Sequence, residues 1–198
     1  MKGSLLITLY ENLRWKTISP QGFRDEMLAY LPNESNSLLF SMALSYLGDC
    51  QRIFPSDSRP LEQALWKIVT TNPVSQHRLQ AFRLYRSIAD SEEAVQRLYT
   101  LWQERKAPKD CTLSESDYIG LSYILAMHLP EKADKIIATQ LSRIQNPDRK
   151  KEYQFISPSV SPRKAERDSV FASLLIAGNR RVEPWASSAL ANLNHRLR

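Results

Sequence analysis

The sequence predicts an all-α protein. Over most of the chain, apolar residues recur three and four positions apart, which is the spacing of one helix face. Strand-like alternation between glycine-rich turns is hard to find, because the chain has only 5 glycines and the nearest candidate, Tyr153 to Ile156, is short. We therefore expect about ten to eleven helices joined by short polar connectors.

The first three expected helices cover 4–14, 20–31 and 36–47. The opening apolar run is too short for a signal peptide or a membrane span and Glu11 interrupts it, so we interpret it as an ordinary helix. Ser19-Pro20 favours a helix start, because proline suits the first helical turn and a serine hydroxyl can accept a hydrogen bond there.

The next three expected helices cover 60–71, 75–89 and 92–106. The third of them follows Ser91, which suits an N-cap, and its first turn is acidic, which the helix dipole favours. All three carry an apolar ridge at helical spacing: Leu61, Leu65, Ile68 and Val69; Phe82, Leu84, Tyr85 and Ile88; and Val95, Leu98, Tyr99 and Trp102.

Five further helices are expected over 115–128, 131–145, 148–155, 162–176 and 183–194. The first has a complete apolar ridge, and most of the others begin at a polar residue or a proline. The residues that justify them are Tyr118, Leu121, Leu125 and Leu129 in the ridge, and Ser114, Asn146-Pro147, Ser161-Pro162 and Pro184-Trp185 at the starts.

The expected architecture is a single helical domain over 1–198. Helices of this length with short connectors usually pack as antiparallel neighbours, and a long series of them stacks into an α-α superhelix. The sequence shows no fixed-period repeat and no convincing linker. We therefore expect an irregular HEAT- or armadillo-like solenoid.

The net charge of +6 lies in the C-terminal quarter. Residues 1–148 contain 17 basic and 17 acidic side chains, whereas residues 149–198 contain 10 basic and 4 acidic ones. This excess indicates either a solvated surface or a patch that faces an anionic group. A nucleic-acid binder is the hypothesis we rank last, because the basic and aromatic residues around Arg83 follow amphipathic helical spacing. We expect neither nucleic acid nor a membrane as partner, and the localisation stays open.

The sequence offers no motif for chemistry. The three histidines, His77, His128 and His195, include no pair at one-turn spacing, and Cys50 and Cys111 are 61 positions apart. A Gly-x-Ser-x-Gly elbow and a Walker-type phosphate loop are both absent. We expect no catalytic residue, no metal site and no cofactor in this chain.

The two ends of the chain resemble the aminopeptidase N family of zinc metallopeptidases. The specific motifs lie in the first 23 and the last 32 residues, although the resemblance extends over nearly the whole chain. They are Leu9-Tyr10-Glu11-Asn12-Leu13, Ile18-Ser19-Pro20-Gln21-Gly22-Phe23, Arg167-Asp168-Ser169-Val170-Phe171, Asn179-Arg180-Arg181-Val182-Glu183-Pro184-Trp185 and Ala189-Leu190-Ala191-Asn192-Leu193-Asn194-His195-Arg196-Leu197-Arg198.

The resemblance implies a C-terminal helical domain that covers the active-site cavity and controls peptide access. The family's His-Glu-x-x-His helix is absent here, so the zinc would belong to the catalytic part of a parent enzyme and this chain would be inactive alone. The implied partners are that catalytic domain, in the same polypeptide, and the peptide substrates of the parent enzyme. The competing hypothesis is a free-standing helical scaffold that binds another protein. A severed domain should expose an apolar patch, whereas a scaffold should be stable and monodisperse alone.

The resemblance also suggests which basic residues could meet a substrate. A peptide held by its amino end directs its carboxylate toward the helical domain, where a cation could bind it. Some relatives place basic residues just before a Phe-x-x-Pro turn. Here the turn is Phe155-Ile156-Ser157-Pro158, and Glu152-Tyr153-Gln154 precedes it in place of cations. The candidate substrate-carboxylate contacts are Lys150 and Lys151, which lie one turn earlier, and Arg163.

Overall fold

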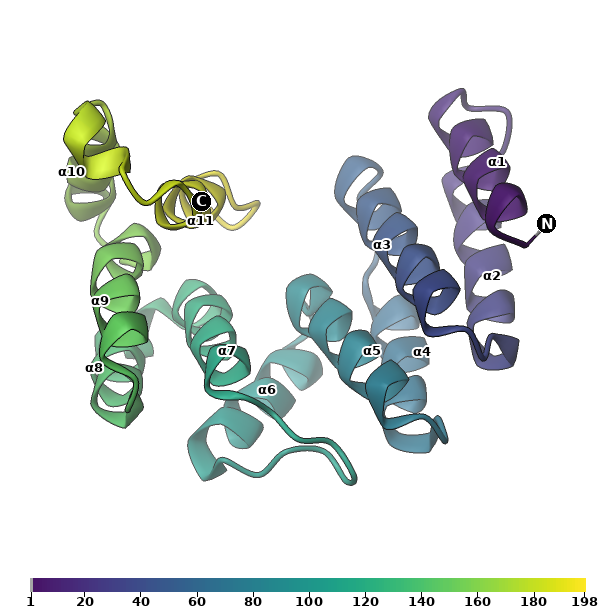
Figure 1. Ribbon diagram of the computed structural model, residues 1–198, viewed down its shortest axis with the longest axis horizontal. Helices are drawn as coiled ribbons and strands as arrows, with labels where there is room; N and C mark the ends of the chain where they lie inside the picture. Colours follow the sequence, from purple (N-terminus) through teal and green to yellow (C-terminus); the bar gives the residue numbers. More distant parts are fainter. Residues whose placement is uncertain (1) are drawn as a thin grey trace. The chain divides into compact units, whose positions relative to one another are not determined.

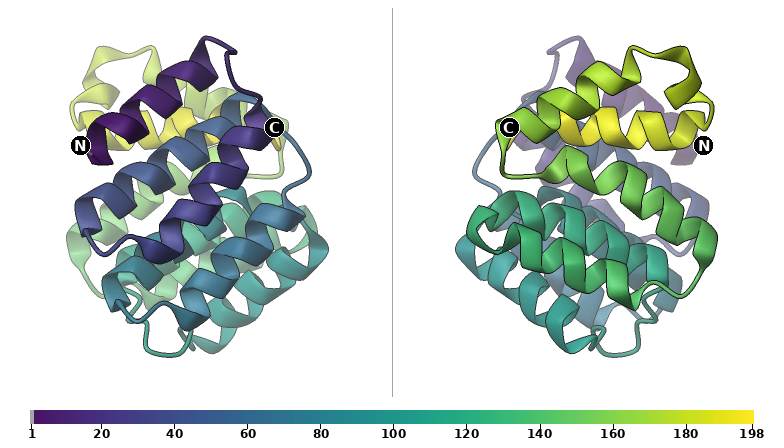
Figure 2. Two further views of the ribbon diagram at one scale, coloured as in Figure 1. Left: turned by 90° about the vertical axis from the view of Figure 1, so that its right-hand side faces the viewer. Right: turned by 90° about the vertical axis from the view of Figure 1, so that its left-hand side faces the viewer.

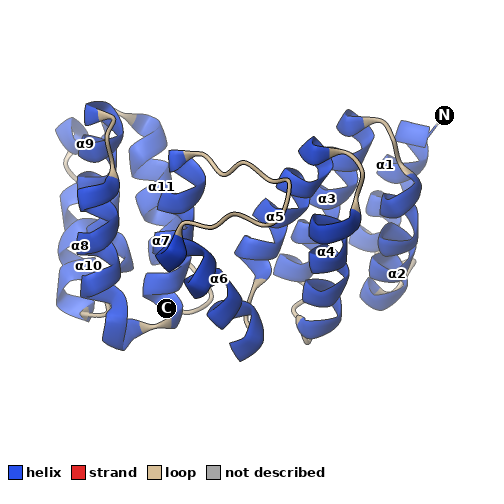
Figure 3. Cartoon of the chain, turned by 90° about the horizontal axis from the view of Figure 1, so that it is seen from below, coloured by secondary structure: helices blue, strands red, loops and turns tan. Residues whose placement is uncertain are grey.

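The protein is all-helical, as the sequence predicts. The computed structural model describes residues 2–198, and in this range it contains eleven α-helices, four 3-10 helices and no strand (Figures 1 and 3). The number of α-helices agrees with the number expected from the apolar spacing.

The helices divide into two compact units. Unit 1 contains the residues up to Arg97 together with Arg105–Thr112, and unit 2 contains Leu98–Glu104 and Leu113–Arg198. The boundary falls inside helix α6, so the sequence at that point carries no linker signal. The single domain and the solenoid that we expect from the sequence stay predictions, and each unit is described here by itself.

Unit 1 is built from the first five helices and the start of the sixth. Helices α1, α2 and α3 contact one another, as the left view of Figure 2 shows, and α5 contacts both α3 and α4. The helices are α1 (Lys2–Arg14), α2 (Pro20–Tyr30), η1 (Leu31–Asn33), α3 (Ser37–Ile53), α4 (Arg59–Thr71), α5 (Ser75–Ile88) and α6 (Glu92–Glu104).

Unit 2 contains the end of α6 and all later helices. Helix α7 packs on α8, and α11 packs on both α9 and α10. The helices are α7 (Glu115–His128), η2 (Pro130–Lys132), α8 (Ala133–Arg143), α9 (Pro147–Ile156), η3 (Ser157–Val160), α10 (Lys164–Leu174), η4 (Ala177–Arg180) and α11 (Glu183–Leu193).

Polar side chains cap five of the eleven α-helices in residues 2–198, and four of these caps, all but Asn36, are predicted from the sequence. The side chains of Ser19, Asn36, Ser91 and Asn146 each accept a backbone hydrogen bond from the first turn of the helix that follows. Ser114 completes a capping box with Asp117, whose carboxylate accepts a hydrogen bond from the Ser114 backbone N–H. Capping therefore positions five helices through contacts that are local in the sequence.

Several expected boundaries differ from the structure by two residues or more. The helix expected at 36–47 continues through Gly48 to Ile53, because Gly48 lies against α5: a Cβ there would be 2.9 Å from Leu84 Cδ1. The helix expected at 162–176 is shorter, and α10 begins at Lys164. The Ser161 hydroxyl accepts a hydrogen bond from the Arg163 N–H, so Ser161 ends the preceding turn and does not cap the helix.

The core of unit 1 is aromatic. Phe23, Phe40, Phe82 and Tyr85 are fully buried, and the imidazole of His77 stacks on Phe40 with ring centroids 4.0 Å apart. His77 Nε2 lies 3.1 Å from Ser37 Oγ, while Nδ1 has no hydrogen-bond partner within residues 2–198. Burial lowers the pKa of His77, and the nearby carboxylate of Glu34 opposes this only in part.

We expect His77 to make the stability of the chain depend on pH. Its folded-state pKa lies below the ordinary value of 6.5, so its contribution is complete above about pH 6.5 and is lost as the pH falls through the folded pKa. Urea unfolding at several pH values between about 7.5 and 5 should show this loss, and His77→Gln should flatten the curve. The same substitution at the half-buried His195 is the control. A wild-type stability that does not change over this range would contradict the prediction.

The core of unit 2 centres on Tyr153. This side chain is fully buried, its hydroxyl lies 3.0 Å from Ser122 Oγ, and its ring stacks on Tyr123 with centroids 5.2 Å apart. In the same unit, Trp102 Nε1 donates a 2.8 Å hydrogen bond to Gln140 Oε1. Buried side-chain hydrogen bonds thus join α7 to α9 and α6 to α8.

Candidate functional site

The three predicted carboxylate contacts lie on two different helices of unit 2. Lys150 and Lys151 are exposed on α9. The ammonium of Lys151 lies 4.0 Å from an Asp148 carboxylate oxygen, and Lys150 has no ion-pair partner among residues 2–198. Both lysines are therefore accessible to an anion.

Arg163, at the N-cap of α10, is bound to two carboxylates. Its guanidinium donates to both Asp134 oxygens at 2.7 and 3.0 Å and to both Glu166 oxygens at 2.6 and 3.1 Å. Hydrogen bonds from Arg163 lower the pKa of both carboxyls, and hydrogen bonds to the two carboxylates raise the pKa of the guanidinium. A substrate carboxylate at Arg163 would have to compete with both acidic side chains.

The Phe-x-x-Pro turn lines an apolar pocket of about 480 Å³ in unit 2. Phe155 and Pro158 form one wall, and Val170 on α10 contributes to the other. The Trp185 ring packs against Phe155 with centroids 5.8 Å apart. The pocket offers room for an apolar side chain, but neither Lys150 nor Lys151 lines it.

The terminal motif residues hold the turn η3 in place. Arg167 donates hydrogen bonds to the Ser161 and Pro162 carbonyls at 2.7 and 2.9 Å. Arg198 Nη2 donates to the Val160 carbonyl at 2.6 Å. The Asn192 side-chain amide donates to Ser159 Oγ at 3.0 Å. Together these contacts give the distinctive C-terminal residues a structural role.

Each unit also exposes large apolar side chains on a helix. In unit 1, Leu5, Ile7 and Trp15 lie on or just after α1, and Trp15 is 79% exposed. In unit 2, Phe171 lies on α10 and Leu175 directly follows it, and Leu175 is 70% exposed. Contiguous patches of exposed apolar side chains are typical of surfaces that another chain or domain covers.

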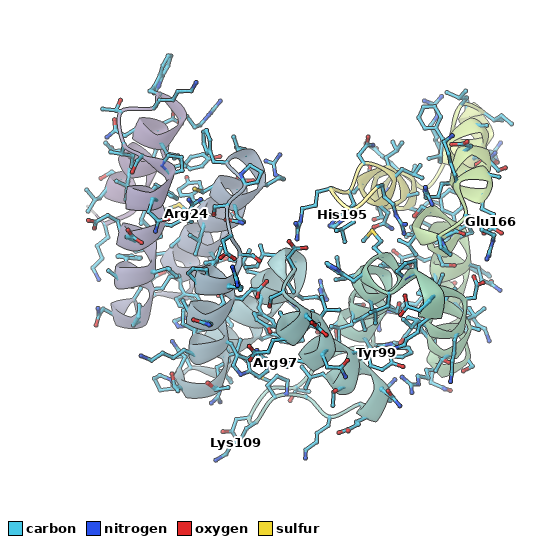
Figure 4. The ribbon with its side chains drawn as sticks, turned by 180° about the vertical axis from the view of Figure 1, so that it is seen from behind. Arg24, Arg97, Tyr99, Lys109, Glu166 and His195 are labelled. Atoms are coloured by element: carbon cyan, nitrogen blue, oxygen red, sulfur yellow. The ribbon has the colours of Figure 1, made fainter. Side chains whose placement is uncertain are left out.

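A second pocket, the α4–α6 groove, lies in unit 1 and has a volume of about 670 Å³. Its central feature is Arg97 of α6, labelled in Figure 4, whose guanidinium lies over the indole of Trp66 at 4.6 Å. Arg97 also donates hydrogen bonds to the Tyr85 hydroxyl at 2.8 Å and to a Glu93 carboxylate oxygen at 2.6 Å. Three partners thus hold this cation in one position.

One end of the groove contains a buried carboxylate, Glu62. It accepts hydrogen bonds from Ser58 Oγ at 2.8 Å, from the Asp90 N–H at 2.7 Å, and from both the N–H (3.1 Å) and the hydroxyl of Ser91. Burial raises the pKa of Glu62, but these hydrogen bonds together outweigh it and leave the pKa below 4.5. Glu62 therefore stays ionised and joins the N-terminal end of α4 to that of α6.

Sequence reasoning did not find the α4–α6 groove. Trp66 is adjacent to Leu65 of the apolar ridge in α4, and a lone tryptophan beside a ridge usually belongs to the core. Its contact with Arg97 joins positions 31 apart in the chain, for which no local spacing rule exists.

Among residues 2–198 we find no cluster of histidine, cysteine and acidic side chains able to hold a metal ion, and no helix with the length and apolar content of a membrane span. Comparisons of the chain with family models, curated proteins and solved structures found no match.

Proposed function

We propose that this chain is the C-terminal helical domain of a zinc-dependent aminopeptidase, which covers the active-site cavity and controls the entry of peptides. The proposal starts from the motif resemblance at both ends of the chain. The observation that carries it is the set of large apolar side chains left in solvent, above all Trp15 on unit 1 and Leu175 on unit 2. The outer helices of a self-contained helical array need polar faces to remain in solution, so these residues favour a part of a larger protein.

In this proposal the domain contributes no catalytic group of its own. The zinc and the catalytic residues belong to the catalytic domain of the same polypeptide. The helical domain acts by limiting access to the cavity and by presenting charge to the distal end of the peptide. Lys150 and Lys151 are the better candidates for a substrate carboxylate, because both are exposed, whereas Arg163 is already paired with two carboxylates.

The test compares two chains in the hydrolysis of aminoacyl-nitroanilides with zinc. One is residues 1–198, and the other also carries the protein sequence encoded immediately upstream in the genome. We expect activity only in the longer chain. If the upstream sequence encodes no zinc motif and neither chain cleaves any substrate, the proposal is wrong and a free-standing protein-binding scaffold becomes the better account.

Trp15→Ser distinguishes a covered surface from a solvated one. In residues 1–198 alone, the substitution should change the free energy of unfolding by less than about 0.5 kcal/mol, because Trp15 is 79% exposed. In the longer chain, it should destabilise the protein by about 2 kcal/mol if the catalytic domain covers this residue. Lys16→Ser, at the exposed neighbouring position, is the matched control. Equal effects of Trp15→Ser in the two chains would show that the catalytic domain does not cover Trp15.

A further inference from the structure

The α4–α6 groove has a defined direction. Glu62 of α4 binds Ser91, just before α6, and Trp66 of α4 lies under Arg97 of α6. The two helices therefore run parallel along the groove. Their N-terminal ends lie at the Glu62 end, and the later residues lie at the Arg97 end.

Most of the charges in the groove are already compensated. The Arg59 guanidinium is bound to both carboxylate oxygens of Asp57, and Arg97 is paired with Glu93. The Glu62 carboxylate has four hydrogen-bond donors. Each of these groups therefore already has an oppositely charged or hydrogen-bonding partner.

Two charges in the groove have no partner among residues 2–198. One is the ammonium of Lys67 on α4, next to Trp66, and the other is the carboxylate of Glu92 on α6, next to Ser91. Both side chains are exposed. Because the two helices run parallel, Glu92 is placed at the Glu62 end and Lys67 at the Arg97 end. The groove thus offers one free negative and one free positive charge at opposite ends.

The separation of these charges limits the size of the ligand. Five residues of α6 separate the level of Glu92 from that of Arg97, which corresponds to a rise along the helix of about 7.5 Å at 1.5 Å per residue. Extended peptide advances about 3.3 to 3.6 Å per residue, so this rise lies between the lengths of two and three residues. A free ammonium and a free carboxylate at about this spacing match the two termini of a very short peptide.

We propose that the α4–α6 groove binds a free di- or tripeptide, with its amino terminus at Glu92, its carboxylate at Lys67, and its backbone along the surface that Trp66 and Arg97 form. The stacked and hydrogen-bonded Arg97 side chain fixes this surface in advance, so binding orders few side chains. The volume of about 670 Å³ is in the range of ligand pockets and is sufficient for a ligand of this size. The inference does not depend on the proposed function, because the groove lies entirely in unit 1 and needs no second domain.

The test is calorimetric titration of the full chain with three probes: trialanine, N-acetyl-trialanine and trialanine amide. Trialanine should bind saturably, and blocking either terminus should weaken binding about threefold to fivefold, as expected for the loss of one exposed ion pair. Lys67→Gln should weaken the binding of trialanine by the same factor and abolish its advantage over the amide. Glu92→Gln should weaken the binding of trialanine by the same factor and abolish its advantage over N-acetyl-trialanine.

The controls are Lys109→Gln and Glu26→Gln, which remove exposed charges of unit 1 outside the groove and should leave all three affinities unchanged. Circular dichroism checks that every variant keeps its helix content. The proposal is overturned if trialanine shows no saturable binding up to about ten millimolar, a weak limit for a specific ligand. It is also overturned if trialanine binds but neither groove variant changes the preference for free termini, because the peptide then binds elsewhere.

Discussion

Glu62→Ala is expected to lower the free energy of unfolding by about 3 kcal/mol, because it removes the acceptor of four hydrogen bonds at a position that is only 3% exposed. Ser58 Oγ is buried with Glu62 and would lose its partner. The same substitution at Gln63, the exposed next residue of α4, should change stability by less than about 0.5 kcal/mol. Urea unfolding of the two variants and the wild type at neutral pH measures both effects.

Glu62→Gln separates the charge of this side chain from its shape. The folded-state pKa of Glu62 lies below 4.5, so the stabilisation from its charge is complete above about pH 4.5 and is lost as the pH falls through the folded pKa. The difference in stability between the wild type and Glu62→Gln should therefore be largest at neutral pH and shrink on acidification. A difference that stays constant down to about pH 3 would show that the charge contributes nothing, since the Glu62 carboxyl of the unfolded chain would by then be largely protonated.

The helix starts could be predicted from the sequence, because the interactions that place them are local. Ser91 and Ser114 each bond to backbone groups within three positions, and the sequence shows both partners. The end of α3 could not be predicted in this way. Its continuation through Gly48 depends on the close approach of Leu84, which is 36 positions away.

The same distinction applies to the candidate sites. The resemblance predicts Lys150 and Lys151, and their exposure on α9 leaves them available. It also predicts Arg163, but Asp134, on another helix, takes part of its hydrogen-bonding capacity. The α4–α6 groove has no sequence signal, since the contact of Arg97 with Trp66 that forms its surface joins positions 31 apart.

Tyr153→Ala is expected to destabilise unit 2 by about 3 to 5 kcal/mol, the usual cost of truncating a fully buried large aromatic side chain. The substitution would leave a cavity, because it removes both the ring that stacks on Tyr123 and the hydroxyl that contacts Ser122 Oγ. Tyr153→Phe is the matched control. It keeps the ring, and Ser122 still donates to the Ile119 carbonyl at 2.7 Å, so the cost should be about 1 kcal/mol.

Tyr153→Ala and Glu62→Ala together also test whether residues 1–198 form one cooperative domain. The two side chains lie in different units, so amide hydrogen exchange reports separately on the loss of stability in each. In a single cooperative domain, either substitution should lower the protection of the most stable amides in both units by the same free energy. If Tyr153→Ala affects only unit 2 and Glu62→Ala only unit 1, the units unfold independently and the single-domain prediction is wrong.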